Sequence, residues 1–191
     1  MISETRKKIR RVAFFGDGSA KRDDKHFVEA KKVAKLLAEN GYIVVNGGGP
    51  GVMLASTLGA KEGGGKVETV VLNPKKEPGN YEGIDKSNME LADKVYTANN
   101  YQERMAKLVE IADAFVVFKG GAGTLSEVGL TWEMAKFEYG RHEPLIFFGK
   151  CWKKIVKEII NNLEMEEIEQ DVVETTSRPA KVLEILKRVN R

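Results

Sequence analysis

The chain has 191 residues and a mass of 21.3 kDa, the size of one ordinary domain, and 42% of its residues are hydrophobic. A chain of this length buries enough apolar surface to fold without a disulfide or a structural metal. Its 31 Lys and Arg residues against 28 Asp and Glu residues leave a formal net charge of +3. This small excess gives no indication of a protein dedicated to nucleic acid or to a membrane surface, and favours a small-molecule ligand.

The remaining composition points to a reducing compartment. One cysteine, Cys151, excludes an intramolecular disulfide, and with only two histidines it provides no Cys/His zinc cluster. Residues 1–10 are basic but lack the apolar segment of a secretory signal, so we interpret them as a lead-in. The uncharged stretch 40–60 is long enough to span a bilayer, but it contains six glycines and Pro50. We therefore expect a cytoplasmic protein with no transmembrane segment, no metal and no cofactor.

Apolar runs of strand length alternate along the chain with segments of helical period. Strands are predicted at residues 11–16, 42–46, 67–72, 94–97, 114–118 and 145–148, with a short last strand at 172–174. Helices are predicted at 24–40, from 52 to about 62, and at 101–112, 124–139, 152–163 and 179–189. Residues 73–86 are interpreted as a loop, and the acidic run 164–171 as a solvated helix end and linker.

This alternation predicts the fold class. Parallel strands need crossover helices, and those helices cover both faces of the sheet. We therefore expect one doubly wound, Rossmann-like α/β domain, with a mostly parallel sheet of about six or seven strands and residues 161–191 packed on the core as a C-terminal extension. Ligands of such sheets bind at the carboxyl ends of the strands, where the winding reverses.

The first loop at that edge begins like a dinucleotide fingerprint. Gly16, Gly18 and Ser19 follow the first strand, but Lys21 stands where the third glycine belongs. The second strand ends in Asn46, where a dinucleotide site would have a ribose-binding carboxylate. The sequence therefore predicts a ligand shorter than NAD in contact with these residues.

Two further glycine-rich loops follow predicted strands. The bare backbone of the loop at 119–124 can approach an anion, while its N–H groups and a threonine hydroxyl donate to it. This phosphate cradle would comprise Gly120, Gly121, Ala122, Gly123 and Thr124. The loop after the second strand has the same placement and contributes Gly47, Gly48 and Gly49, with Met53 just behind it. The alternative for the cradle is a tight turn between a strand and a helix, without a ligand. The flexible thioether of Met53 suits either a contact with a purine or the filling of a gap in the core.

Two charged residues beside these loops have competing interpretations. Thr124 and Glu127 match a capping box, in which Thr124 caps the helix and Glu127 reaches back to its N–H, without any catalytic role. Arg104 lies in the first turns of its predicted helix, next to Met105 of the apolar stripe. The alternative interpretation of Arg104 is a cation at the rim of the protein, paired with a neighbouring glutamate.

Several of these segments together resemble a known family. Residues 118–127, FKGGAGTLSE, are similar to the PGGxGTxxE motif of the LONELY GUY family, the cytokinin-activating nucleoside 5′-monophosphate phosphoribohydrolases formerly described as lysine decarboxylases. The run NGGGPGVM at 46–53 resembles the family's second-strand loop, and ERM at 103–105 its arginine-bearing helix. The likeness covers about residues 11–160 in order, and as a set these motifs are specific.

The resemblance implies hydrolysis of the N-glycosidic bond of a nucleotide such as AMP, which gives free base and ribose 5-phosphate. The family's glutamate and arginine needed for turnover fall on Glu127 and Arg104. A carboxylate beside C1′ stabilises the positive charge that builds on the ribose and orients the attacking water. The resemblance also implies a homodimer, formed through the helices that carry Arg104 and residues 124–139.

One position departs from the motif: its proline is Lys119 in this chain. Lysine brings a cation in place of a residue that stiffens the strand exit. The alternative function is therefore a non-catalytic carrier that binds a phosphorylated ligand, a nucleotide or the molybdenum cofactor, in the same cradle. Neither alternative involves nucleic acid or a membrane.

Overall fold

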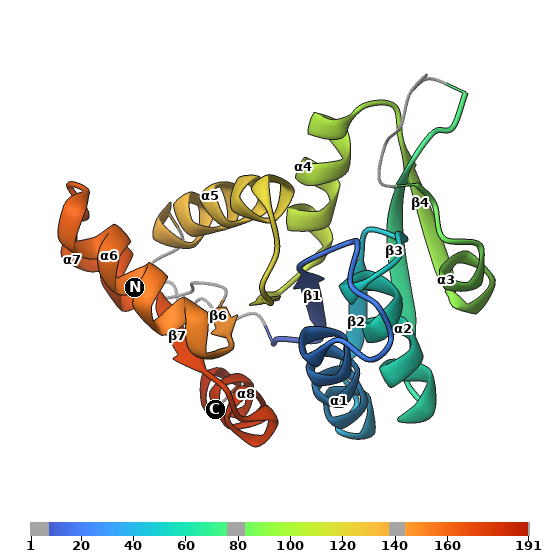
Figure 1. Ribbon diagram of the computed structural model, residues 1–191, viewed down its shortest axis with the longest axis horizontal. Helices are drawn as coiled ribbons and strands as arrows, with labels where there is room; N and C mark the ends of the chain where they lie inside the picture. The colour runs from blue at the N-terminus through green and yellow to red at the C-terminus, as the bar shows by residue number, and fades with distance from the viewer. Residues whose placement is uncertain (1–7, 76–82, 138–143, 191) are drawn as a thin grey trace, which may run out of the picture.

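The structure is a computed structural model, and it describes residues 8–75, 83–137 and 144–190 (Figure 1). Most of the basic lead-in, the middle of the loop at 73–86 and the predicted end of the helix at 124–139 fall outside the described residues. Within these ranges no helix has the length and apolar character needed to cross a membrane.

Strands and helices alternate nearly as expected. The strands are β1 (Arg11–Phe15), β2 (Ile43–Asn46), β3 (Val67–Leu72), β4 (Lys94–Ala98), β5 (Ala114–Val117), β6 (Leu145–Phe148) and β7 (Val173–Thr176). The helices are α1 (Lys25–Glu39), α2 (Val52–Glu62), α3 (Lys86–Leu91), α4 (Tyr101–Ile111), α5 (Ala122–Phe137), α6 (Lys150–Asn162), α7 (Glu167–Asp171) and α8 (Pro179–Val189).

All seven strands lie parallel in one sheet with the order β4-β3-β2-β1-β5-β6-β7. The predicted doubly wound α/β fold is therefore confirmed. The winding starts at β1 in the middle of the sheet, proceeds to one edge through β4, and then returns to continue from β5 to the other edge. The reversal lies between β1 and β5, where Val12 pairs with Ala114.

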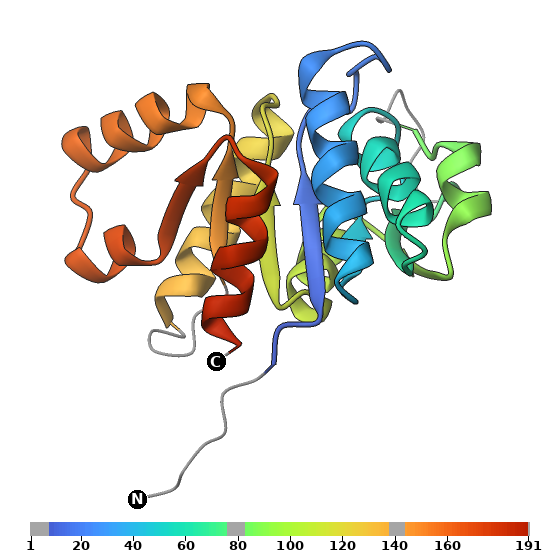
Figure 2. The same ribbon diagram turned by 90° about the horizontal axis from the view of Figure 1, so that it is seen from below.

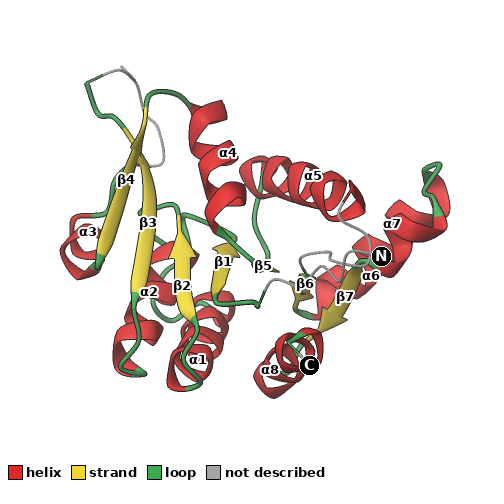
Figure 3. Cartoon of the chain, turned by 180° about the vertical axis from the view of Figure 1, so that it is seen from behind, coloured by secondary structure: helices red, strands yellow, loops and turns green. Residues whose placement is uncertain are grey.

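Two hydrophobic cores form, one on each face of the sheet. Figures 1 and 3 show the helices that lie on the two faces. The alternation of side chains along a strand sends Val12 and Phe14 into one core and Ala13 and Phe15 into the other. Helices α1, α2 and α8 cover the first face, and α4, α5 and α6 cover the second. Because both faces of the sheet are covered, its strands are apolar almost throughout.

Two short helices were not predicted. Helix α3 follows the loop at 73–86, and its first turn is capped by the side chain of Asp85, which accepts a hydrogen bond from the Asn88 N–H at 2.9 Å. Helix α7 lies within the acidic run that we interpreted as a linker. Its first turn is closed by a capping box in which the Glu169 carboxylate accepts from the Glu166 N–H at 2.6 Å. Both helices are only about one turn long, so no apolar period marks them.

Candidate functional site

Three loops that follow β1, β2 and β5 meet at the carboxyl edge of the sheet. Asp17 joins them through its backbone: its N–H donates to the Lys119 carbonyl at 3.0 Å, and its carbonyl accepts from the Val52 N–H at 2.9 Å. The loops are therefore fixed to one another at the point where the winding reverses, which is where ligands of doubly wound sheets bind.

A cavity of about 370 Å³ opens between the first and third of these loops. It is lined by Gly16, Asp17, Gly18, Ser19, Gly121, Ala122, Gly123 and Thr124. All of these residues except Asp17 were predicted site residues, so the structure brings the first loop and the expected cradle together. Helix α5 begins in this wall at Ala122 and has no acidic residue in its first turn. The positive end of its dipole and the N–H groups of that turn therefore favour an anion in the cavity.

The helix start contradicts the capping-box alternative. Because α5 begins at Ala122, Thr124 is the third residue of the helix and not its N-cap. The Leu125 N–H already donates to the Gly121 carbonyl at 3.1 Å, so helical hydrogen bonding starts three residues before the predicted cap. Thr124 is buried against Gly120, where a Cβ atom would lie 2.1 Å from the threonine Oγ1. A glycine at 120 thus permits the close approach of the loop to the helix.

Asp17 is an acidic residue in the wall of the expected anion site. Its Oδ1 accepts both the N–H and the hydroxyl of Ser19, at 2.8 and 2.7 Å, and its Oδ2 lies 3.2 Å from His26 Nε2. Partial burial raises the pKa of the Asp17 carboxyl, but the hydrogen bonds from Ser19 and the contact with His26 outweigh the burial and hold the pKa below its ordinary value. The Ser19 donors that we expected to face a ligand are thus directed to Asp17.

The second glycine loop is supported by a buried polar network. The Asn46 carboxamide oxygen accepts from the Gly48 N–H at 2.8 Å, and its Nδ2 lies within 3.2 Å of the Met53 carbonyl and the hydroxyls of Ser56 and Thr57. Asn46 is completely buried. Its carboxamide therefore supports the loop from within the protein and is not exposed at the edge of the sheet.

Asn88 of α3 completes this network, and the sequence did not indicate it. Its Nδ2 donates to the Gly49 carbonyl at 2.8 Å, and its Oδ1 accepts from the Thr57 hydroxyl at 2.6 Å. Nearby, the Asp85 N–H donates to the Gly48 carbonyl at 3.0 Å. The backbone carbonyls of the predicted residues Gly48 and Gly49 are thus fixed by hydrogen bonds from Asp85 and Asn88. A single asparagine in a short unpredicted helix carries no pattern by which it could have been found.

Arg104 is buried, with 3% of its surface exposed, so the alternative of a solvent-exposed rim cation is wrong. Among its contacts, Nε donates to the Val70 carbonyl at 3.0 Å, and Nη2 donates to the Gly47 carbonyl at 3.1 Å. The same Nη2 lies 3.7 Å from the Met53 sulfur. The structure therefore groups the predicted residues Arg104, Gly47 and Met53. Met53 is itself buried, which corresponds to the core-gap alternative for this side chain.

Glu127 lies on α5, three residues after Thr124 and hence on the same side of the helix. It is half-buried, and its backbone carbonyl accepts from the Thr131 hydroxyl at 2.8 Å. Glu127 is not one of the described residues that line the 370 Å³ cavity. The last residue of α5 in its wall is Thr124. Of the two predicted catalytic residues, Glu127 thus lies on α5 one turn beyond the wall of this cavity, and Arg104 of α4 lies against the second glycine loop.

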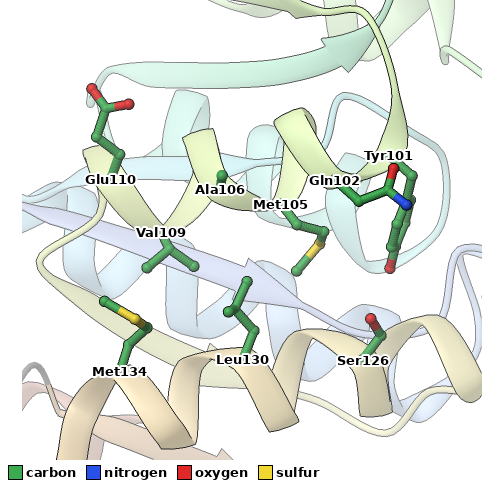
Figure 4. Close-up of a pocket in the computed structure, with 9 residues that line it drawn as sticks. All are labelled: Tyr101, Gln102, Met105, Ala106, Val109, Glu110, Ser126, Leu130 and Met134. Carbon is green, nitrogen blue, oxygen red and sulfur yellow. The ribbon is translucent and has the colours of Figure 1, made fainter. Parts of the chain in front are cut away.

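A larger groove, of about 680 Å³, separates α4 from α5. Figure 4 shows Met105 and Val109 of α4 facing Leu130 and Met134 of α5 across it, with Ser126 near the end marked by Tyr101. Its wall is almost entirely apolar, and Leu130 and Met134 are each 37% exposed. Within the described parts of the chain, no three His, Cys, Asp or Glu side chains group as metal ligands, in this groove or elsewhere.

Comparison with known proteins places this geometry in a family. Residues 9–180 match the SLOG cluster4 family. Over 154 residues the chain is 30% identical to an uncharacterized protein of Archaeoglobus fulgidus, an alignment that covers 81% of this chain and 94% of that protein. Over 135 residues it is 30% identical to the cytokinin riboside 5′-monophosphate phosphoribohydrolase LOG of rice, Oryza sativa subsp. japonica. That alignment covers 68% of this chain and 52% of the rice protein, so the chain spans about half the length of this relative.

Solved structures show the same fold. The molybdenum cofactor binding protein of Rippkaea orientalis superposes with a TM-score of 0.70 at 21% sequence identity, over 98% of this chain and 100% of that chain. At this identity the likeness establishes the fold and nothing further. The match over residues 9–180 and the identity to the rice protein together confirm the resemblance to the LONELY GUY family. The chain belongs to the SLOG cluster4 family.

Proposed function

We propose that this protein hydrolyses the N-glycosidic bond of a nucleoside 5′-monophosphate, AMP or a cytokinin-like nucleotide, to free base and ribose 5-phosphate. The observation that carries the proposal is the cavity at the winding reversal, whose wall joins Gly16–Ser19 to the amino end of α5. The rice relative bears the name of this activity. In the proposal the whole sheet with both helical layers acts as a single nucleotide-binding domain.

The phosphate would bind at the amino end of α5. Charge-assisted hydrogen bonds from backbone N–H groups contribute about 1.5–3 kcal/mol each, and three or four of them hold a monophosphate at micromolar strength after entropic costs. Asp17 places a negative charge in the same wall, but Ser19 and His26 already engage both of its oxygens. We propose that Ser19 acts here by holding Asp17 aside, while the amides of residues 121–124 face the phosphate.

The chemical step needs a carboxylate and a water molecule. The bond between C1′ and the base nitrogen breaks, its electron pair leaves with the base, and positive charge develops on the ribose ring. Glu127 would stabilise that charge and take a proton from the water whose oxygen bonds to C1′. The departing base would take up one proton from solvent, and Glu127 would return its proton to solvent after the step, so that the net reaction consumes one water molecule. The hydroxyls of the ribose would lie between the cradle and this carboxylate.

For Arg104 we propose a positioning role in the same reaction. Its guanidinium joins the Gly47 carbonyl to the Val70 carbonyl of β3, and so fixes the second glycine loop relative to the sheet. Arg104→Lys keeps the charge but loses the planar fork that reaches both carbonyls. We expect this variant to raise KM for AMP more than it lowers kcat, whereas loss of a group in contact with the reacting atoms would lower kcat.

The test is incubation of the purified protein with AMP, followed by chromatographic measurement of adenine. We expect release by the wild type and a loss of about 100-fold or more in kcat for Glu127→Gln, with an unchanged melting temperature and AMP affinity. Glu133→Gln, on an exposed position of the same helix, is the matched control and retains activity. An active Glu127→Gln variant would remove Glu127 from the mechanism. Tight AMP binding without adenine release by the wild type would favour the carrier function for a nucleotide or molybdenum cofactor.

We further propose that a second copy of this chain covers the groove between α4 and α5 (Figure 4). Leu130 and Met134 expose apolar surface along this groove, and the resemblance implies a homodimer through these two helices. Leu130→Glu would place a charge in the interface, and we expect light scattering to show a monomer. Ile155→Glu on α6 alters an equally exposed residue, at 39%, and leaves the dimer intact. A monomeric wild-type protein at micromolar concentration contradicts this assignment.

A further inference from the structure

A second cavity, of about 530 Å³, lies at the same edge of the sheet but beyond the ends of β6 and β7. Its wall includes Lys150 and Lys153 of α6, Arg178 and Lys181 at the start of α8, and the hydroxyl residues Thr176 and Ser177 between them. Figure 2 shows the orange helix α6 and the red helix α8 both starting at the tips of these two strands. None of these residues belongs to the site proposed above.

The topology explains why a cavity forms there. Helix α6 packs into one core through Trp152 and Val156, whereas α8 packs into the core on the opposite face through Val182 and Ile185. Two helices that follow neighbouring strands and leave to opposite faces open a crevice between their amino ends. The same geometry, at β1 and β5, forms the ligand crevice of doubly wound sheets. The edge of this sheet thus contains two such crevices.

The charges of the second crevice are of one sign. The described residues of its wall include four cations and no carboxylate. Lys181 contacts Glu184 at 3.2 Å, but no carboxylate among the described residues pairs with Lys150, Lys153 or Arg178. Lys150, Lys153 and Arg178 are exposed, and four cations around one cavity of a chain with nearly balanced charges give it a positive local potential that attracts anions.

The two helix ends add to this positive field. Neither α6 nor α8 has an acidic residue in its first turn, and neither N-cap residue, Gly149 or Arg178, makes a side-chain capping bond. Cations at these positions oppose the helix dipoles, which favour negative charge at this end. The cations therefore do not stabilise the two helices through their dipoles, and together with the helix ends they favour the binding of an anion.

We propose that this crevice is a second ligand site, which binds the phosphoryl group of a small phosphorylated molecule between the amino ends of α6 and α8. Lys153 and Arg178 would contact the phosphoryl oxygens from opposite sides, since each belongs to a different helix. The volume exceeds that of a phosphate group and accommodates an attached sugar or nucleoside. The two cavities share no described lining residue. A molecule bound in the second crevice would therefore either regulate the reaction proposed at β1 and β5 or add a second ligand to it.

The experiment is a titration of the isotope-labelled protein with inorganic phosphate at constant ionic strength, followed by backbone amide NMR shifts. We expect the amides of residues 149–153, 177, 178, 180 and 181 to shift saturably, residue 179 being a proline without an N–H. The double variant Lys153→Ala/Arg178→Ala should weaken this response at least tenfold. Lys154→Ala/Lys157→Ala, with the same loss of charge at exposed positions of α6 outside the cavity, should titrate like the wild type.

The amides of residues 121–124 report on the other cavity in the same spectra, so failure of one site is distinguishable from failure of the other. A response of residues 149–153 that is absent, or equally weakened in both double variants, overturns the proposal. A labelled single-stranded oligonucleotide, followed by fluorescence anisotropy, provides a second arm. Binding that requires Lys153 and Arg178 and that phosphate does not displace would assign the crevice to a polynucleotide and also overturn it. Well-dispersed spectra of both variants establish that they are folded.

Discussion

The buried guanidinium of Arg104 occupies the space that any side chain at residue 47 would need. A Cβ atom built on Gly47 would lie 1.7 Å from Arg104 Nη2 and 2.8 Å from its Cζ. The two residues are 57 positions apart, and the Gly47 carbonyl accepts a hydrogen bond from the same Nη2. The absence of a side chain at 47 is therefore a condition for the position of Arg104.

This relationship predicts a coupled pair of substitutions. Gly47→Ala should lower the free energy of unfolding by about 1–3 kcal/mol, because the guanidinium is displaced from the Val70 and Gly47 carbonyls. In an Arg104→Ala background the same substitution should cost far less, since the group it collides with is gone. Urea unfolding of the four proteins measures the coupling. An equal cost of Gly47→Ala in both backgrounds would show that the contact with Arg104 is not its cause.

Two neighbouring glycines of the cradle should respond differently to alanine. At Gly120 a Cβ atom would lie 2.1 Å from Thr124 Oγ1 and 3.0 Å from the Asp17 nitrogen, whereas at Gly121 it would meet nothing within 4 Å. We expect Gly120→Ala to lower the melting temperature, because Thr124 is buried and stiff at χ1. Gly121→Ala should melt like the wild type but bind AMP more weakly, as its methyl group enters the cavity. Equal melting temperatures of the two variants would contradict this account of the cradle.

The sequence predicted the sheet and the cavity wall because both depend on local pattern. Apolar runs marked the strands, and glycines directly after β1 and β5 marked the loops that the parallel topology brings together. What it left open depends on tertiary contacts. The position of Arg104 on a helix was compatible with an exposed cation at the rim, and only its burial against the Val70 and Gly47 carbonyls excludes that interpretation. The support of the second glycine loop by Asn88 depends on a helix of six residues, which is too short to show a period.

The buried network beneath that loop predicts the result of a minimal change at Asn46. Asn46→Asp replaces a donor close to three acceptors with a carboxylate that only accepts, at a position with no exposed surface. We expect a loss of about 3 kcal/mol or more in unfolding free energy, and no acquired affinity for NAD. Asn161→Asp makes the same change at an exposed position near the end of α6, where it should cost less than about 1 kcal/mol. Similar costs at the two positions would contradict the proposed role of the network.

The lowered pKa of Asp17 predicts how the free energy of unfolding depends on pH. Because its pKa in the folded protein is below the ordinary value, the unfolded chain takes up a proton first as the pH falls. The stabilisation from Asp17 is therefore fully present above the ordinary carboxyl pKa of about 4 and is lost as the pH decreases through the lower folded value. Asp17→Asn removes this contribution, so its unfolding free energy should lie below that of the wild type at pH 7 and approach it toward pH 3. Urea unfolding at pH 7, 5, 4 and 3 measures the difference, and a gap that stays constant over this range would show that the charge of Asp17 does not contribute to folding.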